Sequence, residues 1–154
     1  MHLSATEKEQ IVNGLSCMPE IKIAYLYGSY ASGLANENSD IDIAVVLKEG
    51  IVPDSYLKME IDIGLRLEDG LKNNKEVDVH IINNAPLYFL NQAVTKGVPL
   101  FASSEPARIE FESQVMMAYL DIKPVYDLYD SYRLQRIKRG EFGVKYRRRN
   151  PAVG

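Results

Sequence analysis

The chain has 154 residues, a formal net charge of −3, and 46% hydrophobic and 25% charged side chains. This length suits one folded domain, and the composition is that of a globular protein rather than a disordered chain. No apolar run approaches the roughly 20 residues of a membrane-spanning helix, so we expect no contact with a membrane.

The spacing of apolar residues and the positions of glycine and proline predict alternating helices and strands. A first helix is expected over residues 4–18, with Pro19 stopping it. The further expected elements, in chain order, are strands at 21–27 and 41–47, a helix at about 53–69, a strand at 76–82, a helix at 86–96, a short strand at 98–102 and a helix at 105–138. Pro124 is expected to kink or divide the last helix. This alternation predicts an α/β domain with a small sheet and a trailing helical arm.

Charge is distributed unevenly along the chain. From Arg133 onward there are eight basic residues and one acid, so residues 1–132 carry about −10 and the remainder about +7. Such asymmetry is typical of a tail that binds a partner, but a solvated helix end with a frayed terminus has the same composition. We expect a single domain over residues 1–139, including the helical arm, and a basic, flexible tail over residues 140–154.

A glycine and a serine directly follow the first expected strand. Gly28 has no Cβ, which lets the backbone approach a ligand closely. The N–H groups of the following turn, with the hydroxyl of Ser29, can hold phosphate oxygens, and Tyr30 could contact a nucleotide. A Gly-Ser pair after a strand is also a common turn, so its interpretation depends on the residues nearby.

Two aspartates stand at the start of the second expected strand. Asp40 and Asp42 are two residues apart, so their side chains share one face of the strand. Neighbouring carboxylates are electrostatically unfavourable unless a cation lies between them, and Mg²⁺ suits such oxygen ligands. A solvated strand end would need no cation, and that alternative stays open for the pair alone.

A third aspartate lies in the middle of a later expected strand. Asp78 and His80 share the face opposite the neighbouring valines. A buried mid-strand carboxylate needs a partner. Beside Asp40 and Asp42, Asp78 would complete the ligands for two-metal nucleotidyl transfer. His80 could lie near the metals or be a hydrogen-bonded neighbour of Asp78.

Gly28-Ser29, followed after ten residues by Asp40-x-Asp42, resembles the signature of the polymerase-β-type nucleotidyltransferase superfamily. The short chain, the later strand aspartate Asp78 and the helical arm resemble the minimal nucleotidyltransferase (MNT) group. Within that group the chain resembles the MntA-type antitoxins, whose partner is a HEPN-type, HepT-like toxin. The motif spans residues 28–42, and the general layout agrees over roughly residues 1–130.

This resemblance implies a mixed sheet flanked by helices, ATP as the donor and Mg²⁺ as the metal. It implies that Asp40 and Asp42 bind metal and that Asp78 completes the metal site and helps to deprotonate the acceptor. Gly28 and Ser29 would bind the triphosphate. In antitoxins of this group the acceptor is a tyrosine on the toxin, an RNase that the added AMP silences, so a hetero-oligomer is expected.

One position departs from the family pattern. Many relatives carry an arginine within Gly-Ser-x-Ala-Arg-Gly, and this chain has Ser32 there, which removes a phosphate-facing cation.

Two alternatives to the antitoxin enzyme remain open. A small-molecule nucleotidyltransferase of the aminoglycoside-modifying kind usually carries a larger acceptor-binding domain than this length allows. A catalytically silent module that masks a toxin by contact alone would have no need of three clustered aspartates.

Other features of the sequence bear on partners and compartment. The acidic body disfavours a broad basic channel, so direct nucleic-acid binding is not expected. The single cysteine, Cys17, excludes an internal disulfide and favours a reducing compartment. We therefore expect a cytoplasmic protein.

Overall fold

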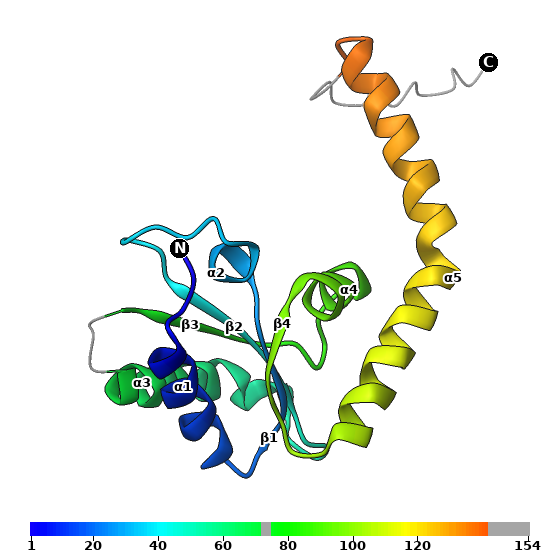
Figure 1. Ribbon diagram of the computed structural model, residues 1–154. Helices are drawn as coiled ribbons and strands as arrows, with labels where there is room; N and C mark the ends of the chain where they lie inside the picture. Colours follow the sequence, from blue (N-terminus) through cyan, green and yellow to red (C-terminus); the bar gives the residue numbers. More distant parts are fainter. Residues whose placement is uncertain (72–74, 142–154) are drawn as a thin grey trace, which may run out of the picture. The chain divides into compact units, whose positions relative to one another are not determined.

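The computed structural model describes residues 1–71 and 75–141 (Figure 1). Its elements are α1 (Ala5–Ser16), β1 (Ile21–Leu26), α2 (Gly28–Ser32), β2 (Ile41–Leu47), the 3-10 turn η1 (Pro53–Ser55), α3 (Tyr56–Leu71), β3 (Val77–Ile81), α4 (Leu87–Lys96), β4 (Val98–Ala102) and α5 (Glu105–Lys138). The chain divides into two compact units, Met1–Tyr119 and Leu120–Gly154. The sheet and the predicted site lie in the first unit.

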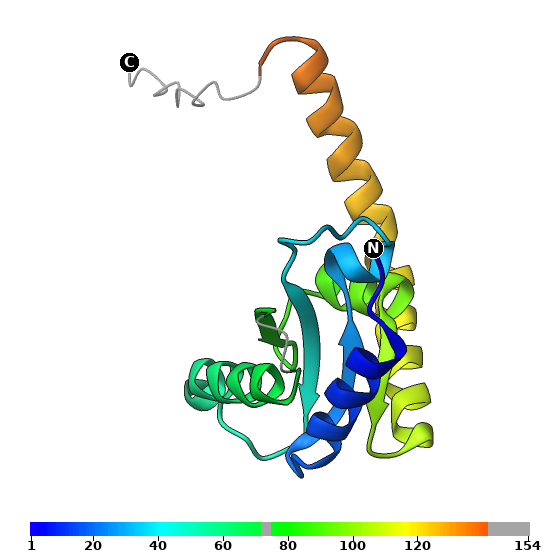
Figure 2. The same ribbon diagram turned by 60° about the vertical axis from the view of Figure 1, so that its left-hand side comes forward.

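The four strands form one mixed sheet in the order β3-β2-β1-β4. β2 and β3 run parallel, whereas β1 pairs antiparallel with both β2 and β4. This arrangement confirms the predicted mixed α/β fold. Because β3 pairs only with β2, it forms one edge of the sheet, and α3 runs beside it (Figure 2).

Alternating side chains place a hydrophobic cluster on each face of the sheet. On β1, Ala24 and Leu26 join the cluster that α1 and α3 complete, including Ile11 and Leu67. Ile23 and Tyr25 face the other way, into a cluster completed by residues of α4 and by Phe111 of α5. Burial on both faces explains why β2 is an almost unbroken apolar run after Asp42.

The first helix begins with a reciprocal cap. The Ser4 hydroxyl accepts a hydrogen bond from the Glu7 N–H (3.2 Å), and the Glu7 carboxylate accepts one from the Ser4 N–H (2.8 Å). Glu7 also pairs with Lys75 at 2.8 Å. One carboxylate thus connects the start of α1 to the residue that precedes β3 by two positions.

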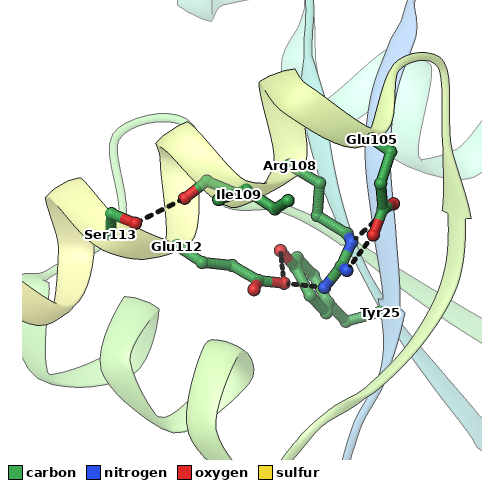
Figure 3. A network of polar contacts seen from close by, with 6 residues as sticks. All are labelled: Tyr25, Glu105, Arg108, Ile109, Glu112 and Ser113. Carbon is green, nitrogen blue, oxygen red and sulfur yellow. Dashed lines mark hydrogen bonds and ion pairs between the residues drawn. The ribbon is translucent and has the colours of Figure 1, made fainter.

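A polar network ties the first turns of α5 to β1 (Figure 3). The Tyr25 hydroxyl donates to Oε1 of Glu112 (3.1 Å), which also accepts from Nη1 of Arg108 (2.7 Å). Arg108 pairs in turn with Glu105. Burial and the Glu112 carboxylate raise the pKa of Tyr25, so its phenol stays protonated and remains a hydrogen-bond donor.

Pro124 does not divide the last helix: α5 continues through it from Glu105 to Lys138. Proline cannot donate to the carbonyl four residues earlier, that of Leu120. Both Pro124 and Leu120 are exposed, so water can hydrogen-bond to that carbonyl and the helix can continue.

Among the described residues, no helix is both long enough and apolar enough to cross a membrane. Most of the predicted basic tail, residues 142–154, lies outside the described residues. The domain boundary at residue 139 and the tail therefore stay predictions.

Candidate active site

The turn after β1 brings the backbone against a catalytic candidate. α2 begins at Gly28, whose φ of +66° favours glycine. A Cβ placed on Gly28 would lie 2.1 Å from Oδ2 of Asp42, so any side chain at this position would overlap the carboxylate as it now lies. The preceding N–H, that of Tyr27, donates to the carbonyl of Asp42 (3.0 Å). Gly28 is therefore required for the turn to pack on β2.

Hydrogen bonds to carbonyl groups at the start of the short helix α2 close the turn that follows it. The backbone N–H groups of Leu34 and Ala35 both donate to the carbonyl of Ser29 (2.9 and 3.1 Å). The Ser32 hydroxyl donates to the carbonyls of Gly28 and Ser29 (3.0 and 3.1 Å). Ser32 therefore stabilises the turn itself.

Two of the predicted acids are direct neighbours in the sheet. Asp42 of β2 and Asp78 of β3 are register partners on adjacent parallel strands, and Asp40 immediately precedes β2. Burial raises the pKa of Asp42, and the negative charges of Asp78 and Asp40 raise it further. Asp42 is therefore repelled by both of its neighbouring carboxylates, as expected for side chains gathered at one end of two strands.

The acids are close but not arranged as a finished coordination sphere. Within residues 1–71 and 75–141, no three Asp, Glu, His or Cys side chains already converge as ligands of one metal ion. Asp78 is about half exposed, so its side chain has room to change rotamer. The metal-binding roles of Asp40, Asp42 and Asp78 therefore stay predictions.

A tyrosine and a histidine lie beside the acid pair. The Tyr27 hydroxyl lies 3.2 Å from Nδ1 of His80, and the same nitrogen lies 3.5 Å from Oδ1 of Asp78. One ring nitrogen cannot accept the Tyr27 proton and donate to Asp78 together, so its two contacts are alternatives. Burial, then Asp42 and Asp78, raise the pKa of Tyr27, which keeps its phenol protonated.

Sequence reasoning treated the tyrosines of this region incompletely. Tyr27 packs against the second hydrophobic cluster, but its hydroxyl lies beside His80, and its position directly before Gly28 was the available signal of this. Tyr30 was expected to be able to contact a nucleotide, but it is only 1% exposed and lies beneath Lys75, whose Nζ is 5.1 Å from its ring centroid. Tyr30 is therefore a core residue.

Two cavities flank the acids. One, of about 230 Å³, lies between α2 and α4 and is lined by Tyr27, Gly28, Ser32, Phe89 and Lys96, among others. The other, of about 390 Å³, lies between α3 and β3 and includes Asp78 and His80 in its wall. One cavity thus borders the Gly28 turn, and the other borders Asp78.

The chain resembles known proteins in sequence. The model of the family described as Polymerase beta, Nucleotidyltransferase matches residues 9–106. The curated protein adenylyltransferase MntA of Shewanella oneidensis is 31% identical over 88 residues, which are 57% of this chain and 59% of that protein. The chain therefore matches less than two thirds of the length of that relative.

The fold also resembles solved structures. A crystal structure of a toxin–antitoxin with AMP-PNP has a TM-score of 0.56 at 24% identity, covering 78% of this chain and 95% of the other. A tri-AMPylated Shewanella oneidensis HEPN toxin in complex with MNT antitoxin gives a TM-score of 0.51 at 22% identity, covering 79% and 93%. At these identities the likeness establishes the fold alone.

The stretch matched by the family includes every residue from which the site was built. The Gly28 turn, the Asp40–Asp42 pair and Asp78 all fall inside residues 9–106, which are well over half of the chain. Together with the mixed sheet, this match shows that the chain belongs to the polymerase beta nucleotidyltransferase family.

Proposed function

We propose that the chain is an antitoxin enzyme that transfers AMP from ATP to a tyrosine hydroxyl of a HEPN RNase toxin and thereby neutralises it. The observation that carries this proposal is the pairing of Asp42 with Asp78 on neighbouring strands, directly beside the Gly28 turn. It is supported by the curated relative, a protein adenylyltransferase, and by the solved relative in which an AMPylated HEPN toxin binds its antitoxin.

The donor set fits a divalent metal. Burial and two neighbouring carboxylates raise the pKa of Asp42, a repulsion that a bound cation would relieve. Asp40, Asp42 and Asp78 offer the carboxylate oxygens that Mg²⁺ prefers. When bound, Mg²⁺ would stabilise negative charge on the phosphates and on the attacking oxygen.

Residues of the chain itself bind the triphosphate and accept the proton of the acceptor. The Gly28–Ser29 turn holds the triphosphate, and Asp78 accepts the proton of the attacking hydroxyl and passes it to solvent. The phenolic oxygen forms a bond to the α-phosphorus while the bond from that phosphorus to the oxygen bridging the α- and β-phosphates breaks. The products are AMP-tyrosine, pyrophosphate and one proton, so atoms and charge balance.

Tyrosine suits this site as the acceptor. Its long, rigid side chain reaches into a cleft that backbone cannot enter, and its phenol, with a pKa of about 10, loses a proton more readily than a serine hydroxyl. The added AMP brings negative charge to the surface where an RNase binds RNA phosphates. Inhibition would then follow from electrostatic repulsion.

The test is the intact mass of a HEPN partner co-expressed with the chain. We expect a gain of one or more AMP units on a tyrosine, dependent on ATP and Mg²⁺, lost with Asp42→Ala and retained with the exposed control Asp54→Ala. A partner that remains unmodified yet is neutralised by the Asp42→Ala chain would overturn the enzymatic proposal and indicate neutralisation by contact alone.

A further inference from the structure

The cavity between α3 and β3 has an open apolar wall that the fold itself does not use. Three α3 side chains on successive turns, Leu57, Ile61 and Leu65, line it and are 69%, 58% and 57% exposed. The residues of α3 that complete the core, Ile63 and Leu67, lie on another side of the same helix. A soluble fold rarely keeps such a second apolar stripe without a partner for it.

The opposite wall of the cavity is the edge strand β3, and two of its backbone N–H groups are already hydrogen-bonded to α3. Oε1 of Glu68 accepts the N–H of Val77 (2.8 Å), and Oε1 of Glu60 accepts the N–H of Ile81 (2.7 Å). Gly64 lets α3 approach this closely, because a Cβ there would lie 2.9 Å from the carbonyl oxygen of Val77. A partner therefore cannot simply add a strand to this edge, and the apolar stripe is what it can bind.

The charges around the cavity indicate the chemistry of its occupant. Glu60, Glu68 and Asp78 line it, and His80 is the one basic side chain among the residues of its wall. Apolar contacts at the centre with acidic residues around them match a protein segment that carries aliphatic or aromatic side chains flanked by lysine or arginine.

The position of the cavity connects it to the reaction. Asp78 and His80 belong to its wall, whereas the Gly28 turn follows β1, on the other side of β2 in the strand order. The attacking and leaving oxygens of a phosphoryl transfer lie roughly in line on opposite sides of phosphorus. A donor held at the Gly28 turn therefore leaves the β3 side, where this cavity opens, for the acceptor.

From these observations we propose that the groove between α3 and β3 is the docking surface of the acceptor protein. An apolar segment of that protein, flanked by basic residues, packs on Leu57, Ile61 and Leu65 and guides the acceptor hydroxyl to Asp78. This inference rests on the proposed function, which it extends from the reaction to the recognition of the partner.

The test compares Ile61→Arg with the matched control Ile109→Arg, an equally exposed isoleucine (54%) on α5 of the same unit. With the full chain and the HEPN partner, Ile61→Arg should raise the KM for the partner about tenfold or more and leave kcat within about threefold. Ile109→Arg and the conservative Ile61→Leu should behave as the wild type. Unchanged melting temperature and ATP affinity would show that each variant is folded.

A second measurement separates this inference from the proposed function. The affinity of the partner for each variant is measured by calorimetry without ATP, where no transfer occurs. If the wild type binds the partner but never modifies it, the proposed function fails, while weaker binding of Ile61→Arg still supports the groove. Wild-type KM and wild-type affinity in Ile61→Arg would overturn the docking proposal, whatever the wild type catalyses.

Discussion

Gly28 and Asp42 lie so close together that a single added carbon on the glycine would overlap the aspartate carboxylate, at 2.1 Å from Oδ2. The residue that opens the proposed phosphate turn and the residue proposed to bind metal thus form one packed contact. Neither can change size without moving the other.

Gly28→Ala should therefore abolish AMP transfer. Its positive φ costs about 1 kcal/mol for any residue with a Cβ, and the added carbon must also displace Asp42. Gly50→Ala is the matched control, because Gly50 also has a positive φ (+91°) but has open space where the Cβ would lie. Denaturation should show at least as large a loss of stability for Gly28→Ala as for Gly50→Ala, and transfer assays should show activity lost only in Gly28→Ala. Equal activity in the two variants would contradict the packing argument.

Asp42→Asn should eliminate transfer while the metal-free protein keeps or gains stability. Asp42 is partly buried beside Asp78 and Asp40, and its charged form is disfavoured by both. An amide of nearly the same shape removes that repulsion. Thermal melting in the presence of a chelator measures this directly. A clearly lower melting temperature would mean that the charge of Asp42 supports the fold.

Lys96→Met should weaken ATP binding by about three- to tenfold. Lys96 lines the cavity that also contains Gly28 and Ser32, so its ammonium can supply the cation that Ser32 does not. An exposed charge contact of this kind contributes at most about 1 kcal/mol and is screened by salt. Calorimetry with ATP and Mg²⁺ at two salt concentrations tests the effect. Lys48→Met, just after the far end of β2, should bind ATP as the wild type does.

Tyr25→Phe should destabilise the fold by about 1 kcal/mol without lowering AMP transfer per folded molecule. The variant removes the hydrogen bond to Glu112 but leaves Glu112 paired with Arg108. Glu112→Ala should cost more, because the buried phenol loses its acceptor and Arg108 loses one of its two carboxylate partners. Urea denaturation of the two variants and the wild type gives the comparison, and midpoints equal to that of the wild type would show that the network does not hold α5 to β1.

Glu7→Gln should remove part of the stability that the protein has above acidic pH. Burial on its own raises the pKa of Glu7, but hydrogen bonds from Lys75 and Ser4 outweigh it and lower the pKa from 4.5 to about 2. A lowered pKa contributes stability above about pH 4.5 that is lost as the pH falls toward 2. The free energy of unfolding of Glu7→Gln should therefore be lower at pH 7 by about 1–2 kcal/mol. It should also change less than that of the wild type as the pH falls from 4.5 to 2. The exposed Glu9→Gln on the same helix should retain the wild-type profile.

The sequence was most informative where chemistry and periodicity coincide. The spacing of Asp40 and Asp42 and the position of Asp78 on a valine-rich strand predicted three acids on neighbouring strands. The register of β2 and β3 places Asp42 opposite Asp78. The bounds of β2 were also predicted, because a run that is apolar except for Asp42 is bounded by the charged residues Asp40 and Lys48.

What the sequence could not predict depends on contacts between distant segments. Which side of the five-residue helix α2 is buried cannot be read from so short a period, so Tyr30 was misplaced. The two hydrogen bonds from β3 to Glu60 and Glu68 join residues that are 21 and 9 positions apart, respectively. The sequence alone suggests that both glutamates are solvated, and only the packing of α3 beside β3 shows that they accept hydrogen bonds from backbone N–H groups.

Those two glutamates also affect how the free protein behaves in solution. An open edge strand is a template on which copies of a chain can polymerise, and β3 is such an edge. With two of its outward N–H groups bound by carboxylates and negative charge along its length, β3 resists that pairing. The chain can therefore keep an apolar groove open for another protein while its own copies are discouraged from joining edge to edge.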